Sequence, residues 1–415
     1  MTLEFKQLIE QIYRMSAMID AVEFEIEEKL EYAYRIFETC DDVPDALRHI
    51  EWVRQPDISG YRGAAPSPLD QPEPINLFVP PPPMPAQASI IAVDGSQIFP
   101  DEMEPVHYYL LNFGAFTYFH GLDRAPEQFV KPELLYHEAY VHDRYDRLIH
   151  NSVVGDRRTL GEMQLLGKLV WEGRKDENFP GPIVALYDNR LLFMPGEPAR
   201  KDENFLRDYW SAFQHLRDGG AILAGYIDNT YISHRFIQLL FLMSLKSYKE
   251  VKLNQHLFSQ GGLQMQGLRD QQFFQAFLPP GHRSAVMVQN SPQNAIFAER
   301  NPAYEIAFFY LKVANAYMSR VIRVDIPIWV ANDPGAVDTL HALLLQQCQM
   351  QGRNPYPYAI SRADELAVVK HTEAEKLRQL IRQELRKKGV RVSAFSAKTY
   401  GKQFARSEKR KHTME

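Results

Sequence analysis

Three short apolar segments of this 415-residue sequence end in an aspartate. Asp94 closes IIAVD, Asp188 closes IVALYD and Asp228 closes ILAGYID. An apolar strand that ends in Asp places a carboxylate at the carboxyl edge of a sheet, where open α/β sheets form their sites. A single Asp in this position more often begins a turn or caps a helix. Two or three that converge indicate a shared site.

Converging carboxylates point to a divalent cation, because they repel one another unless a cation neutralises them. Mg²⁺ and Mn²⁺ prefer oxygen ligands. Two such ions about 4 Å apart stabilise both the attacking and the leaving oxygen of a phosphodiester displacement. The sequence has only Cys40 and Cys348, and no HExxH, GxxxxGK[ST] or GxGxxG motif. It therefore predicts no zinc site and no binding of ATP or a dinucleotide.

The segments around the acids alternate between strands and helices, which predicts an α/β core. We predict strands at SIIAVDGSQ, VHYYLLNFGAFTYF, PIVALYD, AILAGYID, NPAYEIAFFYLKV and SRVIRVDIPIWVA. We predict helices at GEMQLLGKLVWEG, NFLRDYWSAFQHLRDGG, TLHALLLQQCQMQG and ISRADELAVVKHTEAEKLRQLIRQELRKKG. Residues 245–300 show little periodicity, and we interpret them as an insertion.

The two ends of the chain differ from this core. Apolar residues spaced by three and four from Phe5 to Ile26 predict an N-terminal helical arm over residues 1–50, which either docks on its own domain or mediates association. Nine of the 20 residues from Pro66 to Pro85 are proline, so residues 54–86 are interpreted as a linker or a surface strap. The tail, residues 386–415, holds ten Lys or Arg and one acid between Arg386 and Lys411. It is either a solvated surface or a DNA contact.

The overall composition is that of a globular protein, with 45% hydrophobic and 24% charged residues. No apolar run reaches the roughly 20 residues that span a bilayer, and the N-terminus lacks the apolar stretch of a signal peptide. We therefore expect a soluble, cytoplasmic protein that makes no membrane contact.

The order of the motifs resembles that of the NurA nucleases, over roughly Ile90 to Lys402. VDGSQ at a strand end is followed by Arg158 and Glu162 in an Arg-x-x-x-Glu helix, by the strand that ends at Asp188, and by AGYI. The later segments GHRSAVM, FFYL, RVDIPIWVA and NPYPYAISRADELAVV are similar to motifs of bacterial members. The combination is specific, whereas any one tetrapeptide is weak.

The resemblance implies a ribonuclease H-like mixed sheet flanked by helices in residues 87–402. It also implies a DNA nuclease dependent on Mn²⁺ or Mg²⁺, with two ions, that acts as a 5′-to-3′ exonuclease and single-strand endonuclease in DNA end resection. Members form homodimers that dock on the hexameric translocase HerA. The catalytic and metal-binding residues carried over by the motifs are Asp94, Glu162, Asp188 and Asp364. The candidates for DNA binding are Arg283, Ser396, Lys398 and Lys402.

The sequence departs from the family pattern at two places. Asp364 stands where the family usually has a histidine, and Asp188-Asn189-Arg190 replaces Asp-Gly-Ser. Metal binding survives both changes, but a proton-handling imidazole and two small residues are lost. A catalytically inactive DNA-end clamp or adaptor of a translocase ring is therefore the alternative function.

Two further residues are weaker candidates for the functional site. Glu172 follows Glu162 by almost three helical turns, so periodicity does not choose between the two, although the Arg-x-x-x-Glu spacing favours Glu162. Tyr226 is a weak candidate for stacking on an unpaired base, since an aromatic residue near a strand end more often packs in the core.

Overall fold

The computed structural model describes residues 5–17, 19–175, 179, 181–192, 203–228 and 233–389. Its helices are α1 Phe5–Ala17, α2 Ile19–Glu38, α3 Val43–Val53, α4 Glu138–Val141, α5 Asn151–Lys175, α6 Glu203–Asp218, α7 Arg235–Met243, α8 Tyr248–Asn254, α9 Asp270–Phe277, α10 Pro292–Arg300, α11 Ile328–Ala331, α12 Pro334–Gln349, α13 Tyr358–Ala367 and α14 His371–Lys387, with 3-10 turns η2 Gln255–Gln260 and η3 Pro302–Tyr304. Its strands are β1 Ala64–Pro66, β2 Phe78–Val79, β3 Ala88–Ile98, β4 Tyr109–His120, β5 Glu127–Leu135, β6 Ile183–Tyr187, β7 Ala221–Ile227, β8 Arg283–Ser284, β9 Met287–Gln289, β10 Ile306–Ala314 and β11 Ser319–Pro327.

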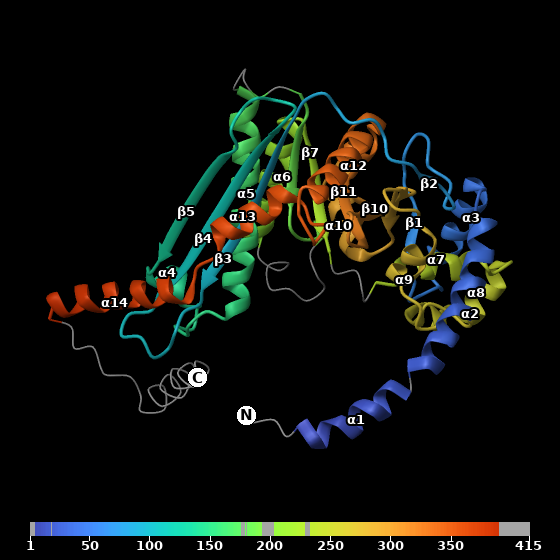
Figure 1. Ribbon diagram of the computed structural model, residues 1–415, viewed down its shortest axis with the longest axis horizontal. Coiled ribbons are helices and arrows are strands. Elements are labelled where there is room, and N and C mark those ends of the chain that lie inside the picture. Colours follow the sequence, from blue (N-terminus) through green and yellow to red (C-terminus); the bar gives the residue numbers. More distant parts are fainter. Residues whose placement is uncertain are drawn as a thin grey trace.

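One mixed sheet of eleven strands runs through the described part of the molecule (Figure 1). Its main path is β1-β9-β10-β11-β7-β6-β3-β4-β5, and β2 and β8 pair beside it. β3, β4 and β5 are antiparallel neighbours, whereas β3, β6 and β7 run parallel to one another. Three antiparallel strands followed by two parallel ones form the ribonuclease H-like arrangement. The predicted fold class, a mixed sheet flanked by helices and preceded by N-terminal helices, is confirmed.

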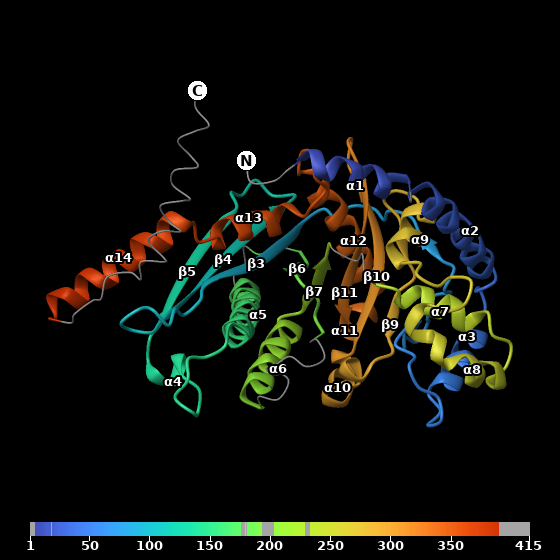
Figure 2. The ribbon, with the colours of Figure 1, turned by 90° about the horizontal axis from the view of Figure 1, so that it is seen from below.

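Helices cover both faces of the sheet (Figure 2). α5 and α6 pack on one face, and α13 crosses β3 and β4 on the other. The alternating side chains of β3 show both contacts: Ile91 and Val93 belong to one buried cluster, and Ile90 and Ala92 to the other. A strand buried on both faces is apolar throughout, which is why IIAVD is recognisable in the sequence.

The N-terminal helices α2 and α3 pack with α7, α8 and α9 at the end of the sheet far from β5 (Figure 1). Phe37 lies at the centre of this group. Its side chain is buried and packs against the rings of Phe78, Phe236 and Phe273. Residues 245–300, interpreted from the sequence as an insertion, are thus an integral part of the fold, since α8 and α9 complete this core and β8 and β9 are strands of the sheet.

The proline-rich segment is a partly buried strap that pairs with the sheet. β1 pairs with β9 and β2 pairs with β8, both at the sheet margin, where a missing proline N–H is tolerated. Between them, Glu73 accepts hydrogen bonds of 2.9 and 2.8 Å from the guanidinium of Arg283. Residues 54–86 therefore hold one end of the sheet in place.

Several details of the secondary structure differ from the predictions. Within the predicted N-terminal helix the structure contains α1 and α2, and residue 18 between them lies outside the described residues. IWVA is the short helix α11, because Pro327 ends β11 and caps that helix. The long C-terminal helix is broken into α13 and α14 at Val368–Lys370. β5 and α4 were not predicted, and β5 is exposed along most of its length, so it lacks an apolar pattern.

No helix in the described ranges is both long enough and apolar enough to cross a membrane.

Candidate active site

The parallel strands β3 and β6 place Asp94 and Asp188 side by side where their pairing ends, although β3 does not end at Asp94 as predicted but continues to Ile98 against β4. Their register pairs Val93 with Tyr187, the residues directly before the two acids. The carboxylates therefore begin at neighbouring positions. Asp228 follows β7 at the same edge, but both of its oxygens accept hydrogen bonds of 2.6 Å from Arg320. This ion pair offsets the charge of Asp228.

Helix α5 brings Glu162 to Asp94 from the other face of the sheet. Glu162 is only 3% exposed. A Cβ atom on Gly95 would lie 2.6 Å from its Oε1, so a glycine after Asp94 is what allows this approach. Arg158 Nε lies 3.1 Å from the same oxygen. These two atoms form an ion pair but are not aligned for a hydrogen bond. Glu162 Oε1 therefore has no hydrogen-bond partner among the described residues.

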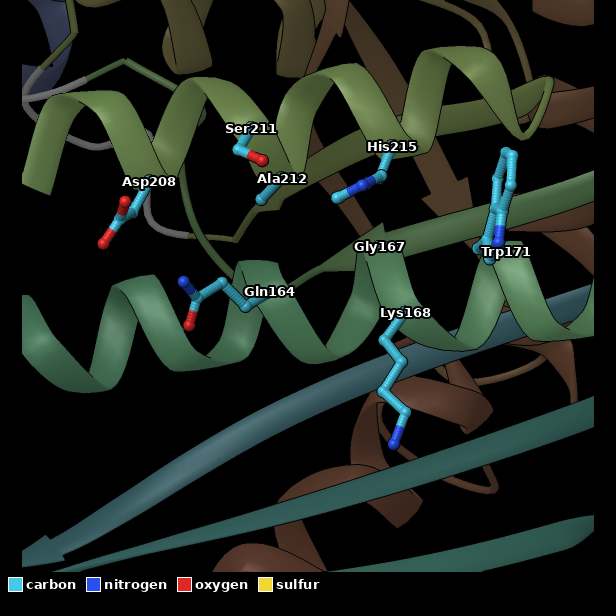
Figure 3. A pocket seen from close by; sticks show the side chains of 8 residues that line it. All are labelled: Gln164, Gly167, Lys168, Trp171, Asp208, Ser211, Ala212 and His215. Atoms are coloured by element: carbon cyan, nitrogen blue, oxygen red, sulfur yellow. The ribbon is translucent and has the colours of Figure 1, made fainter.

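The alternative glutamate, Glu172, lies elsewhere on α5. Its side chain is 57% exposed and stands 3.6 Å from Lys168 Nζ. Lys168 borders a shallow cavity of about 310 Å³ between α5 and α6, on the outer side of these helices (Figure 3). The cavity is lined by Gln164, Gly167, Lys168, Trp171, Asp208, Ser211, Ala212 and His215. None of the acids carried over from the family borders it.

Helix α13 and the turn before it complete the acidic cluster. Asp364 is exposed on α13, and its charge acts on both Asp94 and Asp188. Before the helix, the Tyr356 hydroxyl donates a 2.5 Å hydrogen bond to Asp188 Oδ1. Tyr356 was not predicted from the sequence. The signal available was its place in NPYPY, a rigid turn eight residues before Asp364.

Tyr226 supports this arrangement from the core. It is buried, and its ring packs edge-on against that of Tyr356, with the ring centroids 5.2 Å apart. Its hydroxyl lies 3.9 Å from Cys348 Sγ. A ring enclosed in this way offers no face to a nucleic-acid base, which argues for core packing.

Burial raises the pKa of three of the four acids. It raises the pKa of Asp94 to about 6, and the charges of Asp188 and Asp364 add to the effect. It raises the pKa of Glu162 to about 8, against the opposing effect of the Arg158 guanidinium. It also raises the pKa of Asp188, which the hydrogen bond from Tyr356 partly offsets. Carboxylates that resist ionisation in this way are stabilised by a bound cation.

The donor set suits a hard divalent cation. It consists of carboxylate oxygens, and one of them, Glu162 Oε1, is buried without a hydrogen bond. As the described side chains stand, no three acidic, histidine or cysteine residues surround one point closely enough to bind an ion.

The predicted DNA-binding residues are only partly described. Arg283 is 4% exposed and holds Glu73, and this buried ion pair argues against the predicted contact with DNA. It is a structural residue of β8 that holds the strap on the sheet. Ser396, Lys398 and Lys402 lie outside the described residues.

The strand order is that of a ribonuclease H-like fold, and the four predicted acids lie on β3, on α5, directly after β6 and on α13. A family model described as the NurA domain matches residues 88–369, which is more than half of the chain. The chain therefore belongs to the NurA family of nucleases, as its motifs predict.

Two solved structures are similar to this chain. The crystal structure of the NurA nuclease from Sulfolobus solfataricus is 15% identical, with 91% of this chain and 98% of that chain covered and a TM-score of 0.45. The crystal structure of A. aeolicus Argonaute is 12% identical, with 67% and 28% covered and a TM-score of 0.27. Both superpositions are too loose to add to the family match. No curated protein matches the chain.

Proposed function

We propose that this chain is a DNA nuclease that cleaves phosphodiester bonds with two divalent ions, Mn²⁺ or Mg²⁺, in DNA end processing. The observation that carries the proposal is the buried oxygen of Glu162, which lacks a hydrogen bond beside Asp94 at the carboxyl edge of the sheet. The carboxylates of Asp94, Glu162, Asp188 and Asp364 would hold the ions. When bound, such ions activate a water molecule and stabilise the leaving 3′ oxygen.

The protein's own residues mainly position these charges. The register of β3 and β6 fixes Asp94 beside Asp188, and the hydrogen bond from Tyr356 fixes the rotamer of Asp188. The Arg158 guanidinium lies beside Glu162 and donates a 3.0 Å hydrogen bond to Gln97. It therefore keeps a positive charge next to the buried acid, where it favours the ionised carboxylate.

The test is the cleavage of end-labelled single- and double-stranded DNA with Mn²⁺, Mg²⁺ or chelator. Asp94→Asn keeps the size of the side chain but removes its charge, and we expect at least a hundredfold loss of cleavage with an unchanged fold. Glu172→Gln, on the exposed part of the same helix that carries Glu162, should cleave at the wild-type rate. Metal-dependent cleavage above a tenth of wild type in Asp94→Asn would refute the site. DNA binding without cleavage by the wild-type protein would support the inactive clamp instead.

The proposed partners are a second copy of the chain and a HerA-type hexameric translocase. The feature that supports association is α1, which extends from the body and exposes Phe5, Ile9, Ile12 and Met15 (Figure 1). An apolar helical stripe of this kind is typical of a surface that another protein covers.

A further inference from the structure

Two side chains from the β3–β4 hairpin bind the end of the helix that carries Asp364. The Ser96 hydroxyl donates a 2.5 Å hydrogen bond to the backbone carbonyl of Ala367, and Asn112 Nδ2 donates one of 2.7 Å to the same oxygen. Ala367 is the last residue of α13, so its carbonyl oxygen receives no hydrogen bond from an N–H group of the helix. The hairpin therefore supplies the cap that the helix lacks.

The contact continues along β4 through Gly114. A Cβ atom there would lie 2.5 Å from the carbonyl oxygen of Ala363 and 2.6 Å from the backbone nitrogen of Ala367. Both atoms are backbone and cannot turn aside. Only a residue without a side chain lets the last turn of α13 lie directly on the strand.

This contact joins two acids of the proposed site. Ser96 lies two residues after Asp94 on the same face of β3, and it pairs with Asn112 across the hairpin, as Asp94 pairs with Gly114. On the helix, Asp364 precedes Ala367 by about one turn. The strand that carries Asp94 thus directly holds the helical turn that carries Asp364.

We propose that Ser96, Asn112 and Gly114, here called the α13 latch, are positioning residues that set the distance between Asp364 and Asp94. The inference rests on the proposed function, because it assumes that the two acids share divalent ions. Asp364 is exposed, and without the latch the last turn of α13 loses these two hydrogen bonds to the hairpin. The latch gives the serine of VDGSQ and the asparagine of LLNFG a role in metal binding although neither is a ligand.

The experiment uses the full chain and three measurements. Asn112→Asp keeps the size of the side chain but replaces the donor with a carboxylate that repels the Ala367 carbonyl. Ser96→Ala is a milder change that removes one hydrogen bond, and Ser96→Thr restores a hydroxyl. Thr117→Val is the matched control, since Thr117 is a buried polar residue on the opposite face of the same strand. For each variant, hydrogen exchange of the α13 amides, Mn²⁺ affinity by calorimetry and the Mn²⁺ concentration for half-maximal cleavage are measured.

We expect Asn112→Asp and Ser96→Ala to speed exchange of the α13 amides and to weaken Mn²⁺ affinity by about tenfold, in line with the loss of one buried hydrogen bond. Ser96→Thr and Thr117→Val should resemble wild type in both. Wild-type protection of α13 in the two disruptive variants, or unchanged Mn²⁺ affinity despite a loosened α13, would overturn the latch. Mn²⁺ binding without DNA cleavage by the wild type would refute only the proposed function, whereas no Mn²⁺ binding at all would refute both.

Discussion

At the scale of single residues, Glu162 is an ionisable side chain in a nearly dry position. Its pKa in the folded protein is about 8, against 4.5 for an ordinary glutamate, chiefly because of burial. The folded protein therefore binds this proton more tightly than the unfolded chain does. The protonated Glu162 side chain contributes to the free energy of unfolding. This contribution is complete below about pH 4.5 and is lost as the pH rises through about 8. A full shift of this kind is worth on the order of a few kcal/mol.

Glu162→Gln should accordingly stabilise the protein at pH 8 in the presence of chelator while it abolishes cleavage. Gln carries no charge at any pH, so its advantage over Glu shrinks as the pH falls toward 5 and disappears below about pH 4.5, where Glu162 is protonated in the folded and in the unfolded chain. Thermal melts at both pH values measure this difference. Glu172→Gln is the control, because that side chain lies on the same helix but is 57% exposed. An equal change in melting temperature at pH 5 and pH 8 would contradict the burial argument.

Residues of the site differ in how far the sequence could predict them. Asp188 directly follows the apolar strand β6, as predicted, whereas Asp94 ends only the apolar run of β3 and the strand itself continues to Ile98. The apolar runs were sufficient to predict that the two acids lie where the pairing of these strands ends. The partner of Asp228 was not predictable, because Arg320 lies 92 residues away and reaches it only through the pairing of β7 with β11. Tyr356 was missed for the same reason, since its hydrogen bond to Asp188 spans 168 residues. Local patterns predict elements, whereas contacts between distant elements select the working side chains.

At the scale of elements, α5 lies close to the sheet because of a glycine. A Cβ atom on Gly161 would come 2.3 Å from the ring of Phe113 on β4. Gly161→Ala should therefore destabilise the protein by about 1–3 kcal/mol, despite alanine's better helix propensity, because the helix must shift. The shift also displaces the adjacent Glu162, so cleavage should fall in parallel.

Gly155 on the same helix supplies the control for this prediction, because a Cβ atom there meets nothing within 4 Å. Gly155→Ala should stabilise the protein by up to about 1 kcal/mol, with unchanged cleavage. Chemical denaturation and DNA cleavage measure the two effects. Stabilisation by Gly161→Ala would show that α5 tolerates the added methyl group and that its distance from β4 is not set there.

The N-terminal arm divides into two elements with different roles. α1 exposes its apolar residues, whereas Phe37 on α2 and Ile50 on α3 are buried in the core. Deletion of residues 1–17 should therefore leave the melting temperature unchanged but lower the mass seen by light scattering or abolish binding to a translocase ring. Deletion of residues 1–50 should unfold the protein, since it removes core residues. An unchanged mass and unchanged ring binding after the shorter deletion would return α1 to a role within its own chain.

At the scale of the whole molecule, the net charge of -5 conceals a basic C-terminal end. The basic tail lies largely outside the described residues, and its contribution to DNA affinity is a matter of charge. Truncation after Gly389 removes Arg391, Lys398, Lys402, Arg406, Lys409, Arg410 and Lys411. DNA affinity and the slope of log affinity against log salt should both fall, while saturating DNA is still cleaved. Binding titrations at several salt concentrations measure the slope, and an unchanged slope would make the tail a solvated surface.

The strap also has a consequence for how the protein folds while it is synthesised on the ribosome. Glu73 and its partner Arg283 are separated by 210 residues, and β1 and β2 likewise pair with strands made much later. At a synthesis rate of about 5–20 residues per second, the early half of this contact waits roughly 10–40 s for the late half. During that time the prolines of the strap lack the N–H groups that would pair with a stray strand. The prolines therefore hinder pairing of the strap with other strands before its own partner strands have been synthesised. In the folded protein they also shape the strap.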